Sequence, residues 1–126
     1  MHLEHIFAYN DANRALFTDP ATGLFDAAVF EQIRNLLGMV LLLKYLQNLS
    51  SSNDIYSDKL DDYAKSDIIW NQLLAGHLPS VDTKILPPPF QNAAIAADVS
   101  GAFPRDKVDQ RQSLFFEAFK TVWAQV

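Results

Sequence analysis

The chain of 126 residues contains no cysteine and no cluster of lysines or arginines. The missing cysteines exclude disulfides and thiolate zinc sites, and they leave histidine, carboxylate and amide groups as the available metal ligands. Ten basic and fifteen acidic residues give a formal charge of −5. The sequence therefore lacks the broad basic surface that nucleic-acid-binding proteins usually carry.

The chain also lacks any long hydrophobic run. No apolar segment approaches the roughly 20 residues that a membrane-spanning helix needs, so we expect no membrane partner. The first residues lack the basic and apolar regions of a signal peptide, which together with the missing cysteines favours the cytoplasm. Apolar residues nevertheless make up 49% of the chain, and residues 1–126 are expected to fold as one domain around a hydrophobic core.

Helical periodicity marks most of the chain. Apolar residues recur at helical spacing in four segments, which predicts helices at about 27–36, 54–65, 67–75 and 104–124. In the second of these helices Tyr56, Leu60 and Tyr63 share one face, and Lys59 is expected largely elsewhere. Asp26 is expected to cap the first of these helices, and the polar run at 48–54 the second. The apolar stripe expected on the last helix comprises Val108, Phe115, Phe119, Val122 and Trp123.

Turn-forming residues separate these segments. Residues 9–23 carry asparagine, aspartate, proline and glycine at short intervals, which predicts an irregular loop with one helical turn at about 12–17. Residues 77–103 are rich in proline. Pro87–Pro89 favour an extended polyproline II conformation, and a short helical turn is expected at 93–97. We expect this region to form a long excursion over the surface.

The most apolar run of the chain, Met39–Asn48, allows two interpretations. A continuous apolar segment shows neither helical nor strand phase, so residues 39–44 form either a buried strand or a continuation of the preceding helix. Gly38, directly before the run, favours the strand. The only adjacent carboxylate and imidazole of the chain, Glu4 and His5, lie far away near its start.

Several short motifs follow one another in a set order along the chain. They are Glu4-His5-Ile6, then Asn35-Leu36-Leu37-Gly38, Leu41-Leu42-Leu43 and Asn48, then Asn53, Tyr56, Lys59 and Tyr63, and finally Val108, Arg111 and Trp123. In this order and spacing the chain resembles the HNH-nuclease-like C-terminal domain of the GmrSD family, which comprises modification-dependent restriction and phage-defence proteins. The resemblance extends over almost the whole chain.

The resemblance implies an α+β, mostly helical fold with a ββα-metal core, in which a small two-stranded element is surrounded by packing helices. Its strands would end at Glu4-His5 and span residues 39–43, and its helix would begin near Asn53. It implies a DNA endonuclease whose substrate includes modified DNA. It also implies that the chain lacks the family's first strand and a large N-terminal, ParB-like nucleotide-using domain, carried by the same or a partner chain.

The same resemblance implies the roles of the site residues. His5 would be the general base, Glu4 and Asn48 would hold Mg²⁺ or Mn²⁺, and Asn53 is a weaker metal candidate. Imidazole titrates near neutral pH, and hard divalent cations prefer oxygen ligands. Charge-assisted hydrogen bonds to phosphate are strong, and three basic residues are candidates for nucleic-acid binding: Lys44, Lys59 and Arg111.

Each of these residues also has a purely structural interpretation. His5 would then be a partly buried histidine held by hydrogen bonds, and Glu4 an ordinary solvated carboxylate. The two asparagines would be turn or cap residues. Lys44 and Lys59 would be solvated or salt-bridged surface charges, and Arg111 would pin its helix to a neighbouring carboxylate.

One departure from the family pattern bears on activity. Met39 stands where many members carry asparagine, and methionine cannot make the hydrogen bonds that would brace the loop holding His5. This departure favours an alternative of a different class, a catalytically inactive helical interaction module. In that alternative residues 39–48 continue the preceding helix, and Glu4-His5-Ile6 merely packs. The sequence leaves both functions open.

Overall fold

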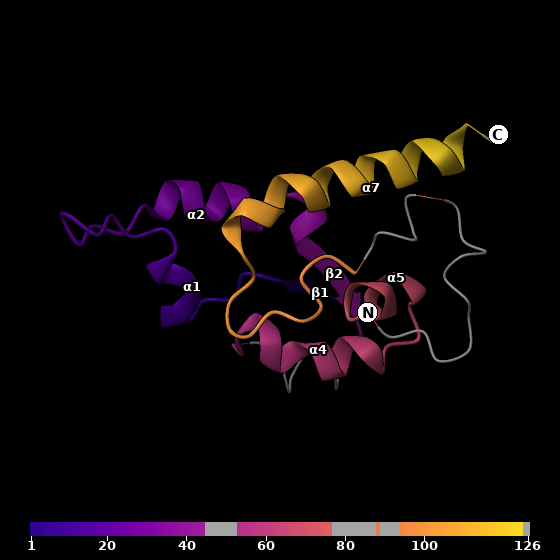
Figure 1. Cartoon of the computed structure of the whole chain (residues 1–126), viewed down its shortest axis with the longest axis horizontal. Helices are drawn as coiled ribbons and strands as arrows, with labels where there is room; N and C mark the ends of the chain where they lie inside the picture. Colours follow the sequence, from indigo (N-terminus) through magenta and orange to yellow (C-terminus); the bar gives the residue numbers. More distant parts are fainter. Residues whose placement is uncertain (45–52, 77–87, 89–93, 125–126) are drawn as a thin grey trace.

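The computed structural model of the chain describes residues 1–44, 53–76, 88 and 94–124. In chain order the elements are β1 (His2–His5), α1 (Asp11–Ala15), α2 (Ala27–Arg34), the 3₁₀ helix η1 (Leu37–Met39), β2 (Val40–Leu43), α4 (Tyr56–Ala64), α5 (Ile69–Leu74), the 3₁₀ helix η3 (Arg105–Lys107) and α7 (Val108–Trp123). The described part is thus α+β, with five α-helices around a two-stranded sheet, as predicted. Figure 1 shows the strands between α7 and α4.

The sheet settles the structure of the apolar run as far as residue 44. Strand β1 pairs antiparallel with β2, and His5 lies opposite Val40. The amide of Ile6 donates to the carbonyl of Met39 (3.0 Å), which extends the ladder by one bond. Leu41 is buried, whereas Leu42 is half exposed, as the alternation of a strand requires. The predicted strand is confirmed at 40–43, where the continued helix is wrong, whereas Met39 belongs to the 3₁₀ helix η1.

Six of the thirteen described residues of the buried core cluster are aromatic, and they come from distant parts of the chain. Phe17 lies edge-on to both Phe7 and Phe30, with ring centroids 5.4 and 5.2 Å apart. Phe103 packs in the same way against Tyr56 at 5.0 Å. Edge-to-face contacts of this kind add roughly 0.5–1.5 kcal/mol per pair beyond the burial of apolar area. The loop after β1, helix α2 and helix α4 are joined through this cluster.

The predicted helices are present but shorter than expected. Helix α2 begins after Asp26, whose side chain accepts from the amide of Val29 at 3.0 Å, so the predicted cap is confirmed. Helix α4 begins at Tyr56, and the residue before it, Ile55, makes no side-chain cap. The prediction that the polar run caps this helix is therefore wrong for residues 53–54, the part of the run that the structure describes. The backbone carbonyls of these two residues instead accept from the side-chain amide of Asn10.

Among the irregular regions, the prediction for residues 12–17 is confirmed, and the predictions for 93–97 and for Pro88 are wrong. Helix α1 confirms the helical turn expected at 12–17. Residues 95–98 form a turn rather than the helical turn expected at 93–97, of which residue 93 lies outside the described residues. Of Pro87–Pro89, expected to be extended, the structure describes only Pro88, which is helical, so the prediction is wrong at that residue.

Helix α7 differs from its predicted apolar stripe. Val108 is buried, but Phe119 and Trp123 are 54% and 60% exposed, and Phe116 is as exposed as Trp123. The stripe expected to pack therefore meets the described body of the protein only in its first half. Figure 1 shows why, because the second half of α7 extends beyond the strands and α4. No helix in the described ranges is both long and apolar enough to cross a membrane.

Candidate functional site

His5 is the last residue of β1, and its ring is held by a residue that the sequence analysis did not single out. The Nε2 atom of His5 lies 3.0 Å from Oδ1 of Asn35, at hydrogen-bond distance. Asn35 is the C-cap residue of α2. Its Nδ2 group donates to the backbone carbonyl of Glu31 at 2.8 Å and to the Oε2 atom of Glu31 at 3.2 Å. A chain of hydrogen bonds therefore links the imidazole to a carboxylate.

The backbone around His5 is braced on both sides. The Nζ atom of Lys59 donates to the carbonyl of His5 at 3.0 Å. The next residue, Ile6, donates its amide to the carbonyl of Met39. The side chain of Met39 is fully buried in the core. Met39 therefore braces the segment that holds His5 through its main chain, a role that does not require an asparagine side chain.

The surroundings of His5 favour its neutral form. Partial burial lowers the pKa of His5 below its ordinary value, and the hydrogen bond to Asn35 offsets this only in part. The positive charge of Arg34 also lowers the pKa, whereas Glu31 raises it. At neutral pH the ring is therefore unprotonated and able to accept a proton, as a general base must.

The lowered pKa predicts a pH-dependent stability. The unfolded chain takes up a proton at His5 near pH 6.5, whereas the folded chain takes it up only at lower pH, so the free energy of unfolding decreases as the pH falls through this range. Urea unfolding at about pH 7.5 and about pH 5.5 measures the loss. We expect a larger loss for the wild type than for His5→Gln. Equal losses would show that the pKa of His5 is not lowered by folding.

Glu4 lies beside His5 but faces the interior. Its side chain is almost fully buried and forms an ion pair with Lys59, which is fully buried. Burial raises the pKa of Glu4 and lowers the pKa of Lys59, and the attraction between the two charges opposes both shifts. Glu4 is thus not the solvated carboxylate of the structural interpretation. The ammonium group of Lys59 neutralises it.

The burial of Lys59 corrects the expected face of α4. Lys59 follows Tyr56 by three positions and precedes Tyr63 by four, and all three side chains have no exposed area. Positions with these spacings lie on one side of a helix. The expectation that Lys59 lies off this face is wrong. It was based on the charge of lysine, whereas the helical spacing places Lys59 on the same face as the two tyrosines. With no exposed area, its ammonium group cannot reach a phosphate in this conformation.

Two other residues predicted for metal and phosphate, Asn53 and Lys44, form no hydrogen bond or ion pair with His5 in the described part of the chain. Asn53 has an exposed side chain, and Asn48 lies outside the described residues. Lys44 is exposed and forms an ion pair with Asp67, in agreement with its structural interpretation. Within the described ranges no group of three or more histidine or acidic side chains could hold a metal ion.

Glu4 does not fit a divalent ion in this arrangement. A hard divalent ion needs several oxygen ligands, and the Oε1 atom of Glu4 already accepts from the ammonium group of Lys59. The same ammonium group also holds the carbonyl of His5. A divalent ion at this carboxylate would have to displace a buried positive charge.

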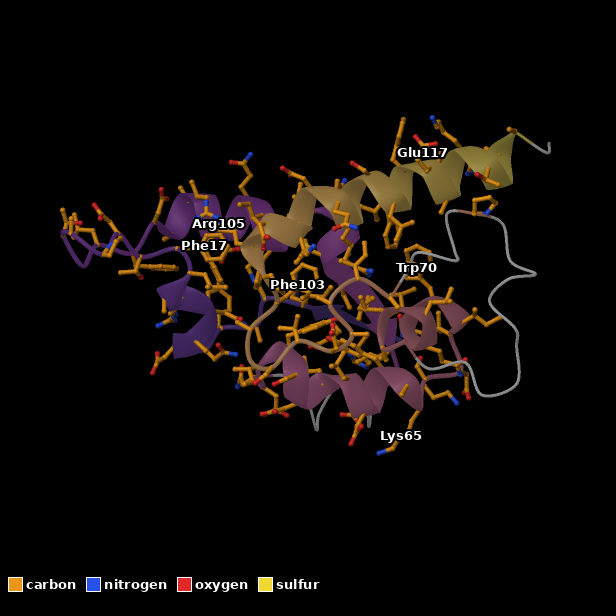
Figure 2. All side chains as sticks on the ribbon, viewed as in Figure 1. Phe17, Lys65, Trp70, Phe103, Arg105 and Glu117 are labelled. Atoms are coloured by element: carbon orange, nitrogen blue, oxygen red, sulfur yellow. The ribbon has the colours of Figure 1, made fainter. Side chains whose placement is uncertain are left out.

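Arg111, the third candidate for phosphate binding, is also fully buried. Its guanidinium carbon lies 5.7 Å from the ring centre of Trp70 and 5.5 Å from that of Phe115. Figure 2 shows Trp70 between α5 and α7. The three guanidinium nitrogens of Arg111 have no hydrogen-bond partner in the described part of the chain, so the expected carboxylate is not found there. Burial lowers the pKa of Arg111 to about 10.

Sequence reasoning missed Asn35 and Glu31 as partners of His5. They are four positions apart in a predicted helix, which places their side chains side by side. This spacing could have suggested the contact between them. Nothing in the sequence could have shown that the end of α2 lies against the end of β1, because that depends on how the elements pack.

Comparison of this chain with protein-family models, curated proteins and solved structures gives no match. The function of the chain is therefore inferred from the geometry around His5 and from the sequence motifs.

Proposed function

We propose that this chain is an HNH-type DNA endonuclease domain of a restriction or phage-defence protein, with His5 as the general base. The observation that carries the proposal is the environment of the imidazole. The Nε2 atom of His5 lies against Oδ1 of Asn35, no described residue bonds to its Nδ1 atom, and burial lowers the pKa of the ring, which favours the neutral form. An oriented, unprotonated ring is what deprotonation of an attacking water requires.

The order of the elements supports the same proposal. Two antiparallel strands are followed by α4, and Lys59 of that helix contacts both Glu4 and the backbone of His5. We interpret β1, β2 and α4 as the ββα core that the resemblance implies. The histidine then lies at the end of the first strand, held from both the second strand and the helix.

In the proposed reaction the Nδ1 atom of His5 accepts a proton from water while the water oxygen bonds to phosphorus and the ester P–O bond breaks, and the departing alkoxide takes up a proton from solvent water. The resemblance also implies Mg²⁺ or Mn²⁺, which would offset negative charge on the phosphate. Because Glu4 is engaged by Lys59, we assign no step to such an ion. Dependence on Mg²⁺ or Mn²⁺ remains a prediction, as does the recognition of modified DNA.

The test is cleavage of plasmid DNA by the full-length protein with Mg²⁺, Mn²⁺ or chelator, on unmodified and modified plasmid. We expect His5→Gln to lower the rate at least about 100-fold, the usual minimum for loss of a general base. His2→Gln, which changes an exposed imidazole on the same strand, should leave the rate unchanged. Equal cleavage by His5→Gln and the wild type would remove His5 from the mechanism.

The second candidate is a non-catalytic interaction module. It is favoured by the row of exposed aromatic side chains on α7, namely Phe116, Phe119 and Trp123, because clusters of exposed apolar residues often mark protein contacts. Its original form, in which residues 39–48 continue the preceding helix, is contradicted at 40–43 by β2. Absence of cleavage by the wild-type protein under every condition above would support this candidate.

A further inference from the structure

We propose that Asn35, locked by Glu31, is a positioning residue that fixes the neutral tautomer of His5 and leaves Nδ1 as its proton-accepting atom. The catalytic meaning of this inference rests on the proposed function. The tautomer itself does not, since it follows from the hydrogen bonds alone.

The amide of Asn35 can face His5 in only one orientation. Its Nδ2 group donates to two oxygens of Glu31, the backbone carbonyl and Oε2. If the amide were turned over, its own oxygen would face both of these acceptors, and two hydrogen bonds would be lost. The Oδ1 atom of Asn35 therefore points at the imidazole.

An acceptor facing Nε2 selects the protonation of the ring. Neutral histidine carries one proton on either nitrogen, and the hydrogen bond of one nitrogen decides the state of the other. The 3.0 Å contact with Oδ1 requires the proton on Nε2, because the other tautomer would place two lone pairs against each other. Nδ1 then holds the free lone pair.

The charges around this chain of hydrogen bonds keep it in place. The NH1 group of Arg34 lies 3.7 Å from the Oε2 atom of Glu31, and the Nε atom of Arg34 donates to the backbone carbonyl of Phe7. Arg34 thus ties Glu31 to the loop that follows His5. On the other side, Lys59 donates to the carbonyl of His5. The side chain of Glu31 and the backbone of His5 are therefore both held.

The test is nitrogen-15 NMR of the histidine rings in the full-length protein at neutral pH. The chain has three histidines, and His5→Gln assigns the signals of His5. In the wild type we expect the signals of one tautomer, protonated on Nε2. Asn35→Leu, similar in shape but without an acceptor, should give a mixture of tautomers. Asn35→Asp keeps an acceptor and places a negative charge against Nε2, so it should retain the Nε2 proton and raise the pKa of His5.

A matched control is Gln32→Leu, which changes an exposed amide on the same helix and should leave the His5 signals unchanged. In the cleavage assay Asn35→Leu should lower kcat about tenfold, equivalent to about 1.4 kcal/mol, with KM unchanged. Wild-type tautomer signals in Asn35→Leu would overturn the inference. Altered signals with unchanged cleavage would instead keep the tautomer assignment and count against His5 as the base.

Discussion

Lys59→Met is expected to lower the free energy of unfolding by about 3–5 kcal/mol, because removing one partner of a buried ion pair leaves the other charge uncompensated. Here that partner is Glu4, which is 3% exposed. The substitution also removes the hydrogen bond to the carbonyl of His5. Methionine is close to lysine in length and shape, so the loss reports the charge rather than a cavity. Urea unfolding followed by circular dichroism measures it.

Two further variants make this result interpretable. In the double variant Glu4→Gln/Lys59→Met no buried charge is left unpaired, so its stability should recover to within about 1–2 kcal/mol of the wild type. Lys44→Met removes the exposed ion pair with Asp67 and should cost at most about 1 kcal/mol. Equal losses for Lys59→Met and Lys44→Met would contradict the importance of the buried pair.

Arg111→Met should have the opposite effect to Lys59→Met. It should raise the free energy of unfolding by about 1–3 kcal/mol, since apolar replacement of buried charged groups is often stabilising. No described residue accepts a hydrogen bond from the guanidinium group of Arg111, and so its removal orphans no acceptor there. The lowering of its pKa to about 10 corresponds to roughly 3 kcal/mol against the charged form. The contacts with the rings of Trp70 and Phe115 offset only part of this free-energy cost.

The control is an arginine that also lies over an aromatic ring but is exposed. Arg105 stacks 4.6 Å from the ring centre of Phe17 (Figure 2) and donates to the carbonyl of Leu16. Arg105→Met should therefore cost about 0.5–1 kcal/mol. A loss of stability in Arg111→Met of the same size or larger would show that its guanidinium group is paired after all.

Local patterns predicted the elements of this fold better than their contacts. The apolar spacing around Phe30 and the cap at Asp26 were enough to predict α2, and Gly38 before a continuous apolar run was enough to favour β2. These features act over a few residues, so one sequence contains the whole signal. The end of α7 was predicted as packed because its aromatic residues follow helical spacing, and spacing alone does not show whether a partner surface exists.

The candidate site depended on the packing of distant elements. His5 was identified from its motif, but its neighbours Asn35 and Lys59 come from α2 and α4, and their approach is set by the aromatic core. Lysine was expected at the surface because that is its usual place. The carboxylate of Glu4 makes its burial tolerable, and this pairing across the fold cannot be read from either residue alone.

The register of the sheet has a consequence for the order of folding. Residues 2–5 pair with residues 40–43, so a long loop must close before the first strand bond can form, whereas α2 and α4 form from local contacts. Loop-closure entropy makes such non-local pairing slow compared with helix formation. His5 is the last residue of β1, so its ring meets Asn35 only after α2 exists. We therefore expect the contact between His5 and Asn35 to form late in folding, after α2 and α4.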